Sequence, residues 1–118
     1  MDEFIRVKPR RDLILWLEQH RAWSEETFGD GQRTTDLIKH IQKELKEIAE
    51  CPNDVMEWID LIILGFDGAL RAGHSPEAVA QALWEKQNIN SKRTWIKTSE
   101  DQPSEHIRYQ DKPSEHLK

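Results

Sequence analysis

Four carboxylates in the middle of the chain are spaced as two matched pairs, Glu44 with Glu47 and Glu57 with Asp60. The members of each pair are three residues apart, so on a helix each pair shares one face. Pro52 stands between the pairs, and a proline disfavours helical geometry in the residue before it. A short break between two helices favours an antiparallel hairpin, which would turn the two pairs toward one another.

The distance of each carboxylate from Pro52 predicts that the two pairs meet. Glu47 and Glu57 lie five residues on either side of it, and Glu44 and Asp60 lie eight. Two antiparallel helices of equal rise therefore bring Glu47 level with Glu57, and Glu44 level with Asp60. Four carboxylates at one height repel strongly unless cations lie between them. A set of oxygen ligands without Cys or His at zinc spacing suits Mg²⁺, with Mn²⁺ as a substitute.

Each pair taken alone is also compatible with an ordinary solvated helix surface. The apolar pattern favours the metal site. In the helix expected from Thr34 or Thr35 to about Cys51, one arc is apolar (Leu37, Ile38, Ile41, Leu45 and Ile48). Glu44 and Glu47 fall on the border of that arc, with His40 beside them. A border position is partly buried and faces a neighbouring helix.

The remaining elements are read from hydrophobic periodicity and from capping signals. We expect an all-α fold of four helices, at about 11–23, 34–51, 53–72 and 75–92, with a loop at 23–35 because Gly29, Asp30 and Gly31 form turns. Thr34 or Thr35 can cap the second helix, and Asn53 or Asp54 the third. Ser75 and Pro76 form a typical helix start, and Gly73 a helix end. We assign residues 1–95 to one domain and 96–118 to a polar C-terminal extension.

The third helix is apolar around most of its circumference, which predicts burial on several sides. Four helices in 118 residues give a thin core, so we expect a homodimer or a homotetramer. A polar stripe nevertheless runs along this helix through Glu57, Asp60, Asp67 and Arg71. We expect Asp67 to pair with Arg71 or another base rather than to bind metal. The tryptophans at 16, 58 and 84 are expected in the core or at a subunit interface.

Composition limits the classes of partner. The net charge of −5 argues against a general nucleic-acid binder, which would carry a basic surface. Cys51 is the single cysteine, so no intramolecular disulfide is expected, as in a reducing compartment. No apolar run reaches the roughly 18 residues that a membrane span needs. We therefore expect a cytoplasmic protein of a bacterium or a phage-infected host.

Two further groups of residues have the chemistry to bind a nucleotide. Lys86, Asn90 and Arg93 share one face at the end of the fourth helix, where cations can hold outer phosphates and the amide a sugar or a phosphate. A solvated basic helix end is the simpler interpretation.

The second group lies in the expected loop. Trp23 and Phe28 could stack on a base, with Ser24, Thr27 and Arg33 nearby for polar contacts. Packing of this loop onto the core explains the same residues equally well. A lone His40 is more typical of a structural hydrogen bond.

The chain resembles a known family. ELKE followed by EWID is similar to the E-x-x-E…E-x-x-D signature of the MazG-like, all-α nucleoside triphosphate pyrophosphohydrolases. WSEETFG, HIQKELKEI, EWIDLIILGFDGALRAGHSPE and KQNINSKRTW resemble the phage and prophage dATP/dGTP diphosphohydrolase branch, which includes MazZ-type enzymes. The resemblance covers residues of roughly 16–95. In the related dimeric dUTPases a Lys-x-x-x-Asn-x-x-Tyr pattern matches Lys86 and Asn90, but Arg93 replaces the tyrosine.

This resemblance implies Mg²⁺-dependent cleavage of purine deoxynucleoside triphosphates between the α- and β-phosphates, by helical subunits that complete their sites by association. Glu44, Glu47, Glu57 and Asp60 would be the metal ligands and catalytic residues, and one of them, with Glu47 favoured, could orient the attacking water. The alternative from another class is a non-catalytic helical module that binds a protein partner, which the acidic surface and the tail would suit.

Overall fold

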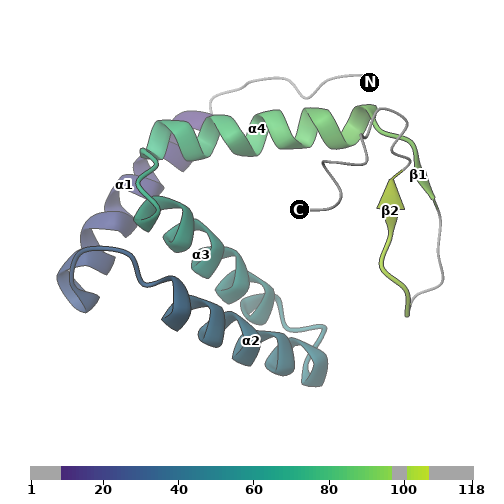
Figure 1. Ribbon diagram of the computed structural model, residues 1–118, viewed down its shortest axis with the longest axis horizontal. Helices are drawn as coiled ribbons and strands as arrows, with labels where there is room; N and C mark the ends of the chain where they lie inside the picture. The colour runs from purple at the N-terminus through teal and green to yellow at the C-terminus, as the bar shows by residue number, and fades with distance from the viewer. Residues whose placement is uncertain (1–8, 97–100, 107–118) are drawn as a thin grey trace, which may run out of the picture. The chain divides into compact units, whose positions relative to one another are not determined.

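The computed structural model describes residues 9–96 and 101–106. These residues form four helices and one short strand pair (Figure 1): α1 (Pro9–Phe28), α2 (Thr34–Glu50), α3 (Val55–Arg71), α4 (Pro76–Lys92), β1 (Trp95–Ile96) and β2 (Glu105–His106). The expected all-α class and the four helices are confirmed. Contacts divide the chain into a unit of residues 6–84 and a second unit that takes the chain from residue 85, so the boundary falls inside α4. None of the described helices combines the length and the apolar composition that a membrane span requires.

The first helix is longer than the sequence predicted. We expected it to end near Trp23, but α1 continues to Phe28. No glycine or proline falls between Trp23 and Phe28, so nothing breaks the helix before Gly29, whose φ of 88° favours a residue without a side chain. The expected loop at 23–35 is correspondingly reduced to residues 29–33.

Two of the three predicted helix caps, those of α3 and α4, are confirmed. Asp54 accepts a hydrogen bond from the Met56 amide at 3.0 Å, and Ser75 accepts one from the Ala78 amide at 3.0 Å. The expected threonine cap of α2 is wrong. Arg33 occupies that position without a side-chain cap, because its carbonyl already accepts the Leu37 amide at 2.8 Å and makes Thr34 the first helical residue.

The core of the unit spanning residues 6–84 is built by α1, α3 and the first half of α4. Leu17, Leu70, Val79 and Ala80 are buried there, and Leu13, Ile14, Phe66 and Ala69 pack against them. Helix α2 lies along α3 (Figure 1) and buries Leu37 and Ile48. The α2–α3 hairpin that Pro52 predicted is therefore present, and it is the part of the fold that carries the four carboxylates.

Much of the apolar surface of α3 remains exposed in the single chain. Val55, Met56, Trp58, Ile59 and Ile62 are between 39% and 65% exposed. The prediction of core positions is wrong for Trp16 and Trp58, which are 37% and 47% exposed. Their placement at a subunit interface stays a prediction. Trp84 is half-buried.

The second unit contains a strand pair that we did not predict. Strands β1 and β2 are antiparallel and pair Trp95 with His106, whose rings lie 5.2 Å apart between centroids. Trp95 also donates through Nε1 to the Asn90 carbonyl at 2.9 Å. Part of the expected extension is therefore ordered against the end of α4. The rest lies outside the described residues, and the division at residue 95 stays a prediction.

The helix caps generate the first testable prediction. Ser75→Ala removes the oxygen that satisfies the Ala78 amide, so it should lower the free energy of unfolding by about 1 kcal/mol. Thr34→Ala is the matched control, since Thr34 does not cap α2, and it should change stability by only a few tenths of a kcal/mol. Urea denaturation measures both. Equal losses in the two variants would contradict the assignment of the caps.

Candidate active site

The hairpin brings three of the four predicted carboxylates together. Oxygen atoms of Glu44, on α2, and of Glu57 and Asp60, on α3, all lie within 4.8 Å of one another. Glu44 is buried, Glu57 half-buried and Asp60 exposed, so the cluster runs from the helix interface out to solvent. Their convergence agrees with the predicted hairpin about Pro52, while the predicted level of Glu47 with Glu57 stays a prediction.

Glu47 completes the cluster electrostatically. Burial raises the pKa of the Glu44 carboxyl above its ordinary value of 4.5, and a hydrogen bond shared with Glu47, together with the charges of Glu47 and Asp60, raises it further. Burial also raises the pKa of Glu57, reinforced by the charges of Glu47 and Glu44. Every one of these effects disfavours negative charge, yet the chain concentrates four acids here.

Two oxygens of the cluster have no hydrogen-bond partner. Glu44 Oε2 and Glu57 Oε2 are both buried and unsatisfied among the described residues. His40 Nε2 lies 3.4 Å from the other oxygen of Glu44, a weak contact by distance. Buried carboxylate oxygens without donors are expensive unless a cation binds them. The donor set of oxygens alone fits Mg²⁺ or Mn²⁺, so the residues present are suited to the metal that the sequence predicted.

A cavity of about 520 Å³ opens beside the cluster. Glu44 and Asp60 lie on its wall, and so do Trp23, Phe28 and Arg33. Two groups of residues that are well separated in the sequence therefore share one cavity. Thr27, which was expected to join them, is exposed on α1 and is not among the residues that line this cavity.

The aromatic part of this wall is pre-formed. The Trp23 and Phe28 rings meet edge to face with centroids 5.7 Å apart, and the Arg33 guanidinium lies over the Phe28 ring at 4.4 Å. Arg33 is also paired with Asp36. Both aromatic side chains are about half exposed, Trp23 at 55% and Phe28 at 51%. Exposed rings held in a fixed arrangement beside a cavity are suited to stacking on a planar ligand.

A row of rings along α1 supports this wall. On a continuous helix Trp16, His20 and Trp23 fall on one face. The Trp16 and His20 rings stack at 5.0 Å, and the His20 and Trp23 rings lie 5.7 Å apart. His20 was not among the predicted site residues, although the spacing of four and three residues between these rings was visible in the sequence.

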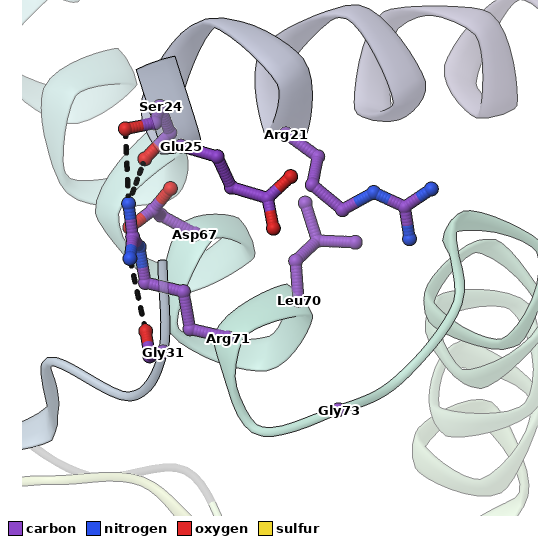
Figure 2. A pocket seen from close by; sticks show the side chains of 8 residues that line it. All are labelled: Arg21, Ser24, Glu25, Gly31, Asp67, Leu70, Arg71 and Gly73. Carbon is purple, nitrogen blue, oxygen red and sulfur yellow. Dashed lines mark hydrogen bonds and ion pairs between the residues drawn. The ribbon is translucent and has the colours of Figure 1, made fainter. Parts of the chain in front are cut away.

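Asp67 is held in a buried network (Figure 2). It accepts hydrogen bonds from His20 Nε2 and from Arg71 Nε, each at 2.9 Å, so the predicted pair of Asp67 with Arg71 is confirmed. Burial acts to raise the pKa of Asp67, but hydrogen bonds from Ser24, His20 and Arg71 and the charge of Arg71 outweigh it and lower the pKa. The negative charge of Asp67 is thus stabilised by donors from the protein, whereas the surroundings of Glu44 and Glu57 disfavour a negative charge.

Comparison with known proteins identifies the family of this chain. The sequence model of the dATP/dGTP pyrophosphohydrolase family matches residues 16–114. The chain belongs to this family. The family's description indicates a pyrophosphohydrolase, and its match runs past residue 95 into the segment that we assigned to an extension.

A curated relative gives no further information on activity. The Eaa protein of Salmonella phage P22 is 38% identical over 102 residues, which are 86% of this chain and 31% of the relative. The chain therefore spans about a third of the length of that protein. No solved structure matches the chain.

The remaining predicted residues of this family member lie in the second unit. Lys86 and Asn90 are on the last turns of α4, and Arg93 follows the helix. Arg93 is half-buried and Lys86 exposed. Asn90 Oδ1 is buried without a hydrogen-bond partner among the described residues, so it is free to accept one from a ligand. Phosphate and sugar binding by these three residues stays a prediction.

The unsatisfied cluster predicts an unusual pH dependence. A carboxyl whose pKa is raised on folding binds its proton more tightly in the folded state. Without metal, stability should therefore increase as the pH falls through the raised pKa values toward 4.5, the ordinary value for Glu. We expect the melting temperature in EDTA to rise between about pH 7.5 and 5, and about 5 mM Mg²⁺ to raise it at pH 7.5.

Glu44→Gln is the variant that tests this origin. Removing one negative charge relieves the repulsion, so the variant should show a flatter pH dependence in EDTA and lose most of the Mg²⁺-induced increase. Glu50→Gln, an exposed residue on α2, is the matched control and should behave as the parent does. Thermal denaturation measures all three proteins. Identical curves for Glu44→Gln and the parent would refute a shared metal site.

Proposed function

We propose that this protein is a Mg²⁺-dependent hydrolase of purine deoxynucleoside triphosphates, dATP and dGTP, which releases the monophosphate and pyrophosphate. One observation carries the proposal: a single cavity has two of the four clustered carboxylates on its wall together with Trp23, Phe28 and Arg33. Membership of the dATP/dGTP pyrophosphohydrolase family supports the same reaction.

Glu44, Glu57 and Asp60 would hold the metal, because their oxygens already converge and two are unsatisfied. When bound, Mg²⁺ offsets the charge of the triphosphate and polarises the phosphoryl group under attack. Glu47 would orient the attacking water and accept its proton as the water oxygen bonds to the α-phosphorus. The bond from that phosphorus to the bridging oxygen breaks, and pyrophosphate takes its electron pair.

The aromatic wall would bind the base. Trp23 and Phe28 are half exposed and fixed by their mutual contact and by Arg33, so stacking on them costs little side-chain entropy. A purine offers more stacking area than a pyrimidine, which supports the preference for purines. Lys86 and Arg93 would hold the outer phosphates and Asn90 the sugar or a phosphate.

Association into a homodimer or a homotetramer belongs to this proposal. The exposed apolar side chains of α3, among them Trp58 and Ile62, are more than scattered surface residues and form a face suited to a second copy. The same face would suit a different protein partner, which is the alternative of a non-catalytic module. The net charge of −5 supports a free nucleotide rather than a nucleic acid as the substrate.

Pyrophosphate release from the four deoxynucleoside triphosphates, with Mg²⁺ and with EDTA, tests the proposal. We expect hydrolysis of dATP and dGTP in Mg²⁺, and its loss in EDTA and in Asp60→Asn. The Glu50→Gln variant should keep the parent rate. A correctly folded parent that hydrolyses none of the four nucleotides would overturn the proposal and favour the non-catalytic module.

The second unit generates a separate prediction. If Lys86 contacts the outer phosphates, Lys86→Ala should lower kcat/KM for dATP by roughly 100-fold, the equivalent of about 2–3 kcal/mol of charge-assisted bonding. The affinity for dAMP, which lacks those phosphates, should change far less. Lys43→Ala, an exposed lysine on α2, is the control. Equal weakening of dATP and dAMP binding would place Lys86 at the nucleoside or the α-phosphate instead.

A further inference from the structure

One arginine ties the end of α1 to the turn that follows it. Arg71, on α3, donates through Nη1 to the carbonyls of Gly29 and Gly31 at 2.8 and 2.9 Å. Its Nη2 donates to the carbonyl and the hydroxyl of Ser24 at 3.0 and 2.7 Å. Together with the bond from Nε to Asp67, the guanidinium of Arg71 donates five hydrogen bonds. Figure 2 shows those to Ser24 and Gly31.

The turn that Arg71 holds determines where two residues of the aromatic wall lie. Gly29 and Gly31 have φ values of 88° and 91°. Without side chains, the two glycines do not by themselves restrict the turn to this conformation. Phe28 precedes this turn and Arg33 follows it, and the contact of 4.4 Å between them spans it. Carbonyls at both glycines are fixed by one planar guanidinium, so the separation of Phe28 from Arg33 depends on Arg71.

Arg71 itself does not face the candidate substrate cavity. It lines a second cavity of about 220 Å³ with Arg21, Gly31 and Gly73. Ser24 and Asp67 line both cavities, so their side chains form the partition between them. Arg71 does not line the larger cavity. Any effect of Arg71 on a ligand there is therefore a positioning effect and not a direct contact.

We propose that Arg71 is a positioning residue that sets purine specificity, by holding the Gly29–Gly31 turn so that Phe28, Arg33 and Trp23 form one stacking wall. This proposal rests on the proposed function of that wall. Lysine can keep the charge next to Asp67 but cannot reproduce the planar fork of hydrogen bonds. Arg71→Lys should thus loosen the turn while retaining a cation beside Asp67.

The expected kinetic signature separates positioning from a general role in stability. Stacking on a pre-formed wall contributes equally to the bound substrate and to the transition state, so its loss raises KM and leaves kcat nearly unchanged. We expect Arg71→Lys to raise KM for dATP by about 10-fold and to keep kcat within about 3-fold. The ratio of kcat/KM for dATP to that for dCTP should also fall, by less than 10-fold, because a pyrimidine stacks on the same wall over a smaller area.

Two other variants make the test decisive. Ser24→Ala removes one partner of Arg71 and should shift KM and the purine ratio in the same direction, by a smaller factor. Arg21→Lys makes the same exchange at another residue that lines the 220 Å³ cavity, and Figure 2 shows its guanidinium pointing away from the Arg71 cluster. It should behave as the parent does. The Mg²⁺-induced rise in melting temperature reports on the carboxylate cluster and should be retained in all three variants.

The outcomes distinguish this inference from the proposed function. A parent that hydrolyses no nucleotide would overturn both. An active parent with unchanged KM and unchanged purine preference in Arg71→Lys would overturn the inference alone. If Arg71→Lys does not fold, Ser24→Ala decides: a higher KM with a lower purine ratio supports the positioning role, and an unchanged ratio refutes it.

Discussion

The structure depends on a cluster of acidic side chains between two helices. Two buried oxygens of this cluster have no hydrogen-bond partner among the described residues. Helices α2 and α3 pack along one another, and their contact includes oxygens of Glu44, Glu57 and Asp60 within 4.8 Å. Burial and mutual repulsion raise the pKa of both Glu44 and Glu57. A hairpin selected only for stability would place apolar or paired side chains here. These carboxylates therefore do not stabilise the hairpin by themselves, and their placement supports the metal site proposed above.

A comparison within α3 supports this distinction. Asp67 lies two helical turns beyond Asp60 and, unlike Asp60, is buried. Ser24, His20 and Arg71 supply it with hydrogen bonds and lower its pKa. Glu57 has an unsatisfied buried oxygen and a raised pKa. The same helix thus contains one acid with partners from the protein and another with a buried oxygen that lacks a partner among the described residues. Burial alone does not separate a structural carboxylate from a ligand-binding one; the presence of donors does.

The parts of the structure that follow from local rules could be predicted from the sequence. Equal spacing about Pro52 predicted a meeting of four carboxylates, because helical rise is the same on both sides of a short turn. Oxygens of three of them, Glu44, Glu57 and Asp60, converge. The end of α1 was predicted too early because the turn formers Gly29, Asp30 and Gly31 were taken to extend the loop back to Trp23. A glycine ends a helix at its own position, and α1 continues to Phe28. Arg71 could be paired with Asp67 four residues away, but not with carbonyls 40 and 42 residues away, since no periodicity connects such positions.

The two networks also differ in what their loss would do. Arg71 joins α3 to Ser24 on α1 and to the turn that follows it, so this network fixes the relative positions of elements. The carboxylate cluster connects α2 and α3 by a repulsive contact, and a cation is needed to make it attractive. Asp67 and Glu44 both line the larger cavity, so one cavity has on its wall an acid with hydrogen-bond donors and an acid with an unsatisfied buried oxygen. If the proposed metal binds there, it would contribute to assembling the site as well as to the chemistry within it.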